Sequence, residues 1–176
     1  MGLSIVAMSV PSSAENRPNE VEFERLVDAE ARRLYRLALA IVDGPTEAED
    51  AVQETMVIAW RRWSSLQGLL NPSAWLTRVC VRECIRQRRL IRWRSVGAGG
   101  SSLEQPQFPL SDVGELMDLH RAYQHLSARQ RAMVTLHHHD GFTVDECAVF
   151  LGCRPGTARS HLGRAMAKLR KELADA

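Results

Sequence analysis

The strongest pattern in the chain lies at residues 143–169, which read TVDECAVFLGCRPGTARSHLGRAMAKL. Thr143, followed three residues later by Glu146, predicts a capping box and the start of a short helix. Gly152 predicts the end of that helix, and Thr157 predicts the cap of a longer helix that continues almost to the C-terminus. A short helix, a tight turn with Gly and Pro, and a basic second helix predict a helix-turn-helix.

The second of these helices has one apolar side and one basic side. Small and apolar residues recur at helical spacing and predict the buried side: Ala158, Leu162, Ala165 and Leu169. Arg159, His161 and Arg164 are predicted to point outward, with Ser160 at the groove-facing end and Lys168 placed to reach phosphates. The alternative is a solvated basic face on an ordinary helical hairpin.

The rest of the chain shows helical periodicity, and no alternating apolar run predicts a strand. Residues 21–42 form the first predicted helix. Thr46 with Glu49 predicts a second helix start, and Ser127 with Gln130 predicts another. Asn71 before Pro72 predicts an N-cap and the first residue of a helix.

Two helical domains are expected, because the segment between the helical regions has no period and is rich in Gly, Ser and Pro. The predicted fold is all-α: two small helical domains joined by a flexible linker, the second a helix-turn-helix domain. We predict a disordered tail at residues 1–20, a first domain at 21–94, a linker at 95–112 and a second domain at 113–176.

The charges nearly cancel overall but not locally. The formal net charge of +2 excludes a wholesale polycation. Residues 15–54 carry −6, residues 78–94 carry +6 and residues 154–176 carry +4. We therefore hypothesise that the acidic and basic segments form separate surfaces that bind separate partners, since a basic stripe is typical of nucleic-acid binding.

The first basic block predicts a cationic rail on one helix. At 100° per residue, one quadrant of the helix holds Arg78, Arg82, Arg86 and Arg89. Such a rail can follow a phosphate backbone, and Trp75 near its start can stack on an unpaired base. The alternative for Trp75 is an ordinary core residue.

Other functional classes are not favoured. The longest apolar stretch near the N-terminus is far short of a membrane span, so we expect a cytoplasmic protein with no membrane partner. Residues 137–139 are three histidines, which could suggest a metal site shared with Cys147 and Cys153. The spacing of the two cysteines does not match a zinc knuckle, however, so we favour structural thiols over a metal or redox role. No cofactor, metal or catalytic constellation is expected, and nothing indicates an enzyme.

Several motifs together resemble the extracytoplasmic-function (ECF) subfamily of bacterial RNA polymerase sigma factors, within the sigma-70 superfamily. They are Glu47-Ala48-Glu49-Asp50-Ala51-Val52-Gln53-Glu54-Thr55, Trp60-Arg61, Ala74-Trp75-Leu76 with Arg78, and Cys153-Arg154-Pro155-Gly156-Thr157 with Ser160 and Leu162. The resemblance extends from about Glu22 to Leu173, and the order and spacing of the motifs make it specific.

The resemblance implies three partners. Asp50, Gln53 and Glu54 match the motif by which the family's region 2 docks on the β′ clamp helices of core RNA polymerase. The β subunit is a further expected contact, and the linker is expected near the RNA exit path. Promoter DNA is the second partner, and an anti-sigma factor, which commonly holds members of this family inactive, is the third.

The resemblance also assigns DNA contacts. For the minus-ten element these are Trp75, Arg78, Arg82, Arg86 and Arg89; for the minus-thirty-five element they are Arg154, Thr157, Arg159, Ser160, His161, Arg164 and Lys168. Arg82 and Arg86 stand where many members carry Asn and Asp. His161 stands where the family usually has Arg, which weakens bidentate base recognition.

The predicted function is therefore that of an ECF-type sigma factor, which binds core RNA polymerase and directs promoter recognition, DNA melting and transcription initiation. The alternative is a stand-alone helix-turn-helix regulator that binds duplex DNA without polymerase. A third hypothesis is a sigma-factor mimic that titrates an inhibitor, which would need neither the rail nor readers such as Arg159.

Overall fold

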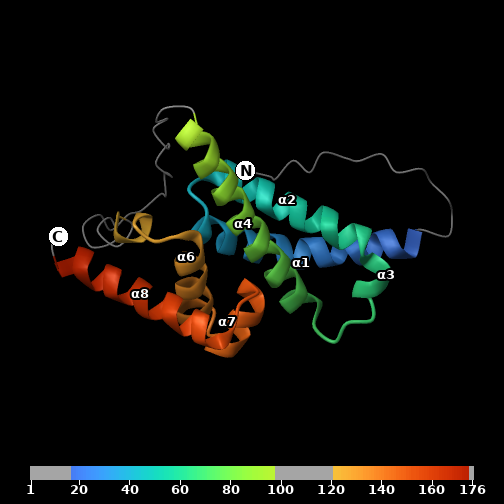
Figure 1. Cartoon of the computed structure of the whole chain (residues 1–176). Coiled ribbons are helices and arrows are strands. Elements are labelled where there is room, and N and C mark those ends of the chain that lie inside the picture. The colour runs from blue at the N-terminus through green and yellow to red at the C-terminus, as the bar shows by residue number, and fades with distance from the viewer. Residues whose placement is uncertain (1–16, 98–120, 175–176) are drawn as a thin grey trace, which may run out of the picture.

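The computed structural model describes residues 17–97 and 121–174, and the regular elements within them are all helical (Figure 1). The first range holds α1 (Arg17–Ile41), α2 (Pro45–Arg61), α3 (Trp63–Leu66) and α4 (Pro72–Gly97). The second holds a helical turn at 121–124, α6 (Ala128–Val134), the π-helix η1 (Thr135–His139), α7 (Val144–Leu151) and α8 (Pro155–Ala174). The predicted all-α class is confirmed. None of the described helices combines the length and apolarity needed to cross a membrane.

Three predicted helix starts are confirmed by capping contacts. The Ser127 hydroxyl accepts a hydrogen bond from the Gln130 amide at 3.3 Å, and the Gln130 side chain accepts one from the Ser127 amide. Thr143 and Glu146 form the same reciprocal pair, while the Asn71 side chain accepts from the amide three residues ahead. These side chains satisfy amides that lack a partner within the helix.

Other predicted boundaries need correction. Helix α1 begins at Arg17, inside the predicted tail, and α4 continues to Gly97, past the predicted boundary at residue 94. Helices α2 and α8 begin at Pro45 and Pro155, so Thr46 and Thr157 lie in the first turn and are not caps. Proline is suited to the first helical position because its φ is already helical and it has no amide to satisfy.

Parts of the predicted tail, linker and second domain lie outside the described residues. These are residues 1–16 of the tail, residues 98–112 of the linker, and residues 113–120 at the start of the second predicted domain.

The first range forms a helical unit in which α1, α2 and α4 pack on one another. Leu34, Leu37 and Ile41 of α1 are buried in its core. Near the N-terminal end of α1, the centre of the Phe23 ring lies 5.0 Å from that of Trp60 and 5.3 Å from that of Trp63. These aromatic contacts cover the end of the core beside α3. The apolar spacing of α1 is the reason it buries one face so completely.

The second range forms the predicted helix-turn-helix. Helix α8 packs on α6 and α7, with Ala158, Ala165 and Leu169 buried, as the spacing predicted. The helix that begins at Ala128 changes to π-helical geometry at Thr135 and ends at His139.

The larger of two apolar clusters among the described residues extends across both ranges. It includes Leu34 and Cys80 from the first range and Met133, Leu136 and Leu151 from the second. Helix α7 packs on α4, and α6 packs on both α1 and α4, as Figure 1 shows. The two predicted domains are therefore in direct contact, which the sequence did not indicate.

Gly152 at the helix-turn-helix turn provides a stability prediction. Its φ of +65° is unfavourable for other residues, and a Cβ there would lie 2.9 Å from a guanidinium nitrogen of Arg82. We expect Gly152→Ala to lower the free energy of unfolding by about 1–2 kcal/mol in urea denaturation. Gly163→Ala is the control: it lies within α8 with nothing within 4 Å of the new Cβ, and should stabilise by about 0.5–1 kcal/mol. Equal signs for the two variants would contradict this explanation.

Candidate functional site

The N-terminal half of α8 presents most of the predicted DNA contacts to solvent. The exposed members are Arg154, Thr157, Arg159, Ser160, Arg164 and Lys168. Among the described residues, one ion pair lies on this face and joins Arg159 Nη2 to Asp145 Oδ1 at 3.4 Å, with both side chains about two-thirds exposed (64% and 69%). Exposed pairs of this kind contribute little to stability, so a phosphate or base edge can replace the carboxylate.

Lys168 is also engaged within the protein. Its ammonium group donates a hydrogen bond to the His125 carbonyl at 3.3 Å, which connects α8 to the segment before α6. The lysine nevertheless remains exposed, so it can reach a phosphate from this position.

His161 does not point outward as predicted. Its side chain is half-buried, and its Nε2 atom is inaccessible and has no hydrogen-bond partner among the described residues. At 100° per residue it lies only about 60° from Ala158, at the edge of the buried side. Burial, followed by Arg129 and Arg164, lowers the pKa of His161, so the imidazole is neutral at pH 7. A neutral, half-buried imidazole is not a bidentate reader of guanine.

The predicted cationic rail is present on α4. Arg78, Arg82, Arg86 and Arg89 are all exposed, and Arg86 pairs with Glu83 at 2.6 Å. Arg82 differs from the others because it lies over the helix-turn-helix turn, next to Gly152. Partial burial, followed by Arg78, lowers the pKa of Arg82.

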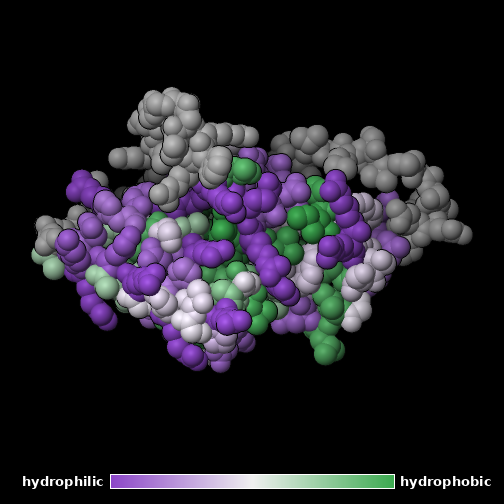
Figure 2. Space-filling model, in the orientation of Figure 1, coloured by the Kyte–Doolittle hydropathy of each residue, from purple (hydrophilic) through white to green (hydrophobic). Residues whose placement is uncertain are grey.

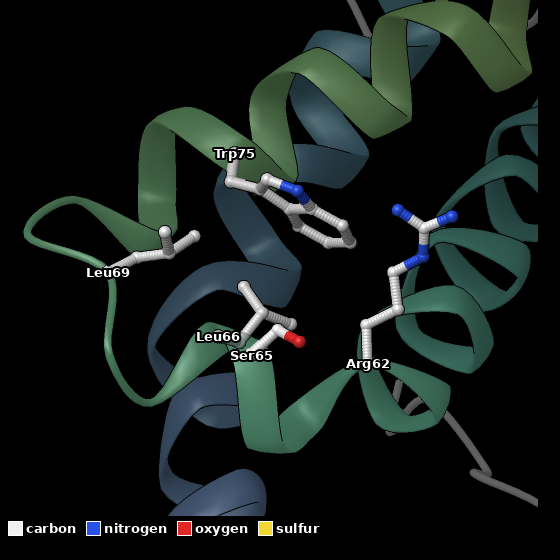
Figure 3. Close-up of a pocket in the computed structure, with 5 residues that line it drawn as sticks. All are labelled: Arg62, Ser65, Leu66, Leu69 and Trp75. Atoms are coloured by element: carbon white, nitrogen blue, oxygen red, sulfur yellow. The ribbon is translucent and has the colours of Figure 1, made fainter.

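A pocket of about 270 Å³ opens at the base of α4 and is lined by Arg62, Ser65, Leu66, Leu69 and Trp75. Figure 3 shows the Trp75 indole and the Arg62 side chain on opposite sides of this pocket, with Leu66 and Ser65 below the indole. This volume is slightly below the usual range of small-molecule sites, about 300–1,000 Å³. An aromatic wall, a guanidinium and leucine side chains suit one flat ring with polar edges.

Trp75 fits both of the alternatives that the sequence left open. It is half-buried against the apolar core, and it also forms a wall of the pocket. The sequence did not single out Arg62 or the leucines of this pocket. Two adjacent leucines in the short loop before Asn71, Leu69 and Leu70, were a usable signal in the sequence. In the structure Leu69 is 42% and Leu70 fully exposed, and the loop shows green in Figure 2.

A polar network fixes the first turn of α4, from which Trp75 projects. Glu30 accepts hydrogen bonds from Ser73 and from Arg33, and Arg33 in turn donates to the Thr77 hydroxyl at 3.0 Å. The network joins α1 to α4. Its side chains are far apart in the sequence, so their pairing could not be predicted from residue spacing. It holds the pocket wall in place, because a rotation of this turn would move the indole.

The loop below the pocket is also tied to α1. The Gln67 side-chain amide donates to Glu22 at 2.9 Å and to Asn19 at 3.0 Å. Asn19 belongs to the segment that was predicted to be a disordered tail. The first turns of α1 thus help to position the loop.

The acidic face of α2 lies away from its packed side. The packed side consists of Ala48, Ala51, Thr55 and Ala59. Asp50 and Gln53 are exposed and Glu54 is half-exposed, and no ion pair or hydrogen bond to these three side chains is found within the described residues. The carboxylates of Asp50 and Glu54 are available to a cationic partner.

Cys147 and two of the three adjacent histidines make contacts within the protein. Cys147 is buried, and burial, together with Glu146, raises its thiol pKa to about 11, which disfavours the reactive thiolate. His137 Nδ1 contacts the Phe142 carbonyl at 2.7 Å, and His139 Nδ1 contacts Asp140 at 2.7 Å. Over residues 17–97 and 121–174, no group of three metal-ligating side chains is found.

A helix-turn-helix, a basic rail beside an aromatic pocket and an exposed acidic face are together typical of a DNA-binding transcription factor with an additional protein partner. Comparison with known proteins agrees. Residues 26–94 match sigma-70 region 2, and residues 116–169 match sigma-70 region 4.

Relatives match along most of the chain. The RNA polymerase sigma-E factor of Streptomyces coelicolor is 32% identical over 161 residues, covering 87% of this chain and 86% of the relative. The ECF RNA polymerase sigma factor SigL of Mycobacterium tuberculosis is 33% identical, covering 84% and 86%. The sigma factor RpoE of Bartonella quintana, solved in complex with the anti-sigma factor NepR, matches with a TM-score of 0.72 and 28% identity, covering 87% and 97%.

The chain belongs to the ECF family of RNA polymerase sigma factors. It binds core RNA polymerase and directs promoter recognition, DNA melting and transcription initiation. The alternative of a regulator that acts without polymerase is favoured by none of these matches. The region 2 match accounts for the first helical unit. A regulator that acts without polymerase would give this unit no role.

Proposed function

We propose that the chain divides its work as a sigma factor among three surfaces. The acidic face of α2, with Asp50, Gln53 and Glu54, docks on the β′ clamp helices of polymerase, and the β subunit provides further contacts. The rail and pocket hold the minus-ten element, and α8 reads the minus-thirty-five element. The observation that carries this division is the separation of charge: an unpaired acidic face on α2 and exposed arginines on α4 and α8.

At the minus-ten element, the pocket takes a base that has left the duplex stack. Unstacking costs free energy, and stacking on an indole returns about 1–3 kcal/mol per base. Arg78, Arg86 and Arg89 are exposed further along the same helix as Trp75 and hold the backbone of the displaced strand. The supporting observation is that the pocket and the rail share one helix, α4.

At the minus-thirty-five element, α8 lies in the major groove. Arg159 and Arg164 are the base readers, because they are exposed arginines in the first half of the helix. Arg154, Thr157, Ser160 and Lys168 contact phosphates and fix the position of the helix. His161 supports the helix from its buried edge and makes no base contact in this proposal.

The chain acts by binding, without catalytic chemistry or a cofactor of its own, and works in the cytoplasm, where the polymerase is. An anti-sigma factor is the third proposed partner. The support is the Bartonella quintana relative, which matches 87% of this chain in a structure that includes its anti-sigma factor.

Run-off transcription with purified core polymerase and a genomic promoter library tests the proposal. Core polymerase with this protein should initiate at a defined set of promoters, and core polymerase alone should not. Absence of initiation, together with specific binding of duplex DNA by the protein alone, would favour the regulator without polymerase and refute the proposal.

Arg159→Ala tests the reading helix. We expect promoter binding by the holoenzyme to weaken by about 10- to 100-fold, corresponding to about 1–3 kcal/mol for one bidentate arginine–guanine contact. Polymerase binding should remain unchanged, because Arg159 pairs only with Asp145 in the described structure. Filter binding with consensus and mutated minus-thirty-five sequences measures the effect. Uniform weakening on both sequences would identify Arg159 as a phosphate contact instead.

A further inference from the structure

The loop between α3 and α4 carries the most exposed large apolar side chain of the described residues. Leu70 is fully exposed, whereas no other large apolar side chain in the described ranges exceeds 57%. The next residue back, Leu69, is itself 42% exposed. The loop projects from the first helical unit, as Figure 1 shows. The fold of this chain therefore leaves the whole Leu70 side chain in water, which is unfavourable for an apolar group.

Contacts within the protein hold this loop at both ends. At its start, Gln67 donates to the two α1 side chains described above, and the Leu69 amide donates to the Leu66 carbonyl at 3.0 Å. At its end, the Asn71 side chain caps α4. A loop that is fixed in this way presents Leu70 in one place, so little conformational freedom is lost when the leucine meets a partner.

The surroundings of Leu70 point to a nucleic acid as that partner. Its neighbour Leu69 lines the pocket, and Figure 3 shows Leu69 across the pocket from Arg62, on the side of Trp75. Helix α4 begins directly after the loop and carries the cationic rail. The apolar tip is thus followed by an aromatic pocket and then by a row of arginines, an order that suits bases and phosphates.

The size of the apolar tip also favours DNA over a protein. A stable protein interface takes about 20–30 residues from each side, and two adjacent leucines are far fewer. A single apolar side chain is, however, what DNA-bending proteins insert between two base steps, where it partly unstacks them. Leucine is one of the residues used in this way.

We propose that Leu70 is a wedge that enters the duplex beside the base held in the pocket. The proposal rests on the proposed function, in which the pocket takes a base of the minus-ten element. A base that leaves the stack opens a gap, and its neighbours lose a stacking surface. Leu70 fills this gap and exchanges water for the faces of the neighbouring bases. It promotes opening, whereas Trp75 holds the base afterwards.

Two promoter templates separate these roles: one fully paired, and one with mismatches that keep the minus-ten region open. In run-off transcription with core polymerase, we expect Leu70→Ala to slow initiation about 10-fold on the paired template. On the open template the effect should be less than about twofold, because no base step remains to be separated. Trp75→Ala should lose activity on both templates, since the pocket is still needed after opening.

Two further variants control for side-chain volume and position. Leu70→Met keeps an apolar side chain of similar volume and should retain about half or more of the activity on the paired template. Leu173→Ala removes the same atoms from a leucine that is 45% exposed in the last turn of α8, outside the proposed DNA contacts. It should change activity on neither template. Polymerase affinity of Leu70→Ala, measured by surface plasmon resonance, should equal that of the unmodified protein.

Three results would overturn the wedge. They are full activity of Leu70→Ala on the paired template, an equal loss on both templates, and weaker polymerase binding, which would make the loop a protein contact. In each of them the unmodified protein still initiates, so the proposed function stands. If the unmodified protein initiates on neither template, the proposed function fails and the wedge fails with it.

Discussion

Glu54→Lys should weaken binding to core RNA polymerase by roughly 100-fold or more, about 3 kcal/mol. Glu54 is half-exposed on the acidic face of α2, without an ion pair among the described residues. The reversal changes the local charge by two and places a cation against the cationic surface expected on the polymerase. Like charges across an interface cost several kcal/mol, which is more than the loss of one attractive contact. Surface plasmon resonance with immobilised core polymerase measures the effect.

Glu24→Lys is the matched control for this reversal. Glu24 is an exposed acid on α1, away from the α2 face, and its reversal changes the net charge equally. We expect less than a threefold effect on polymerase binding from this control, since exposed charges away from an interface are screened at physiological salt. Equal weakening by both reversals would show that overall charge, not the α2 face, governs docking.

Trp75→Ala should reduce promoter opening by about 10- to 100-fold, because it removes the stacking surface of the pocket, worth about 1–3 kcal/mol. Trp75→Phe keeps an aromatic face and should retain most of the activity. Binding of a fluorescent single-stranded minus-ten oligonucleotide to the holoenzyme measures stacking directly. Permanganate reactivity of thymines in the promoter measures opening.

The half-buried position of Trp75 makes folding a necessary control for this variant, since the ring also packs against the apolar core. Thermal unfolding of Trp75→Ala separates a stability loss from a binding loss. If Trp75→Ala opens promoters normally, or if Trp75→Phe fails as completely as Ala, the pocket is not the site that receives the base.

Much of the fold was predictable because its signals are local. The capping boxes at Ser127 and Thr143, the Asn71 cap and the Gly152 stop each depend on residues within about one helical turn. The predicted starts of α2 and α8 differ from the observed starts at Pro45 and Pro155. In each case a nearby Thr was interpreted as the cap, although the proline occupies the first helical position.

The candidate sites were predictable to the extent that they follow helical periodicity. Exposed arginines on α4 and α8 and the acidic face of α2 follow directly from 100° per residue. His161 was misplaced because it lies at the margin of the buried side, where a small rotation of the packed helix decides exposure. The pocket was missed in part because Arg62, Leu66 and Trp75 meet only through the fold of the α3–α4 loop.

Amino-acid order alone established the all-helical class, the helix-turn-helix, the family and the sign of charge on each helix, since these depend on neighbours within a few turns. Tertiary packing settled which charged groups meet. Arg88 resembles its neighbours on the rail in sequence, yet it turns inward to Asp43, and Arg131 joins them from a distant segment. Burial makes those contacts strong and specific because the buried groups have lost their water, and no local pattern encodes such a loss.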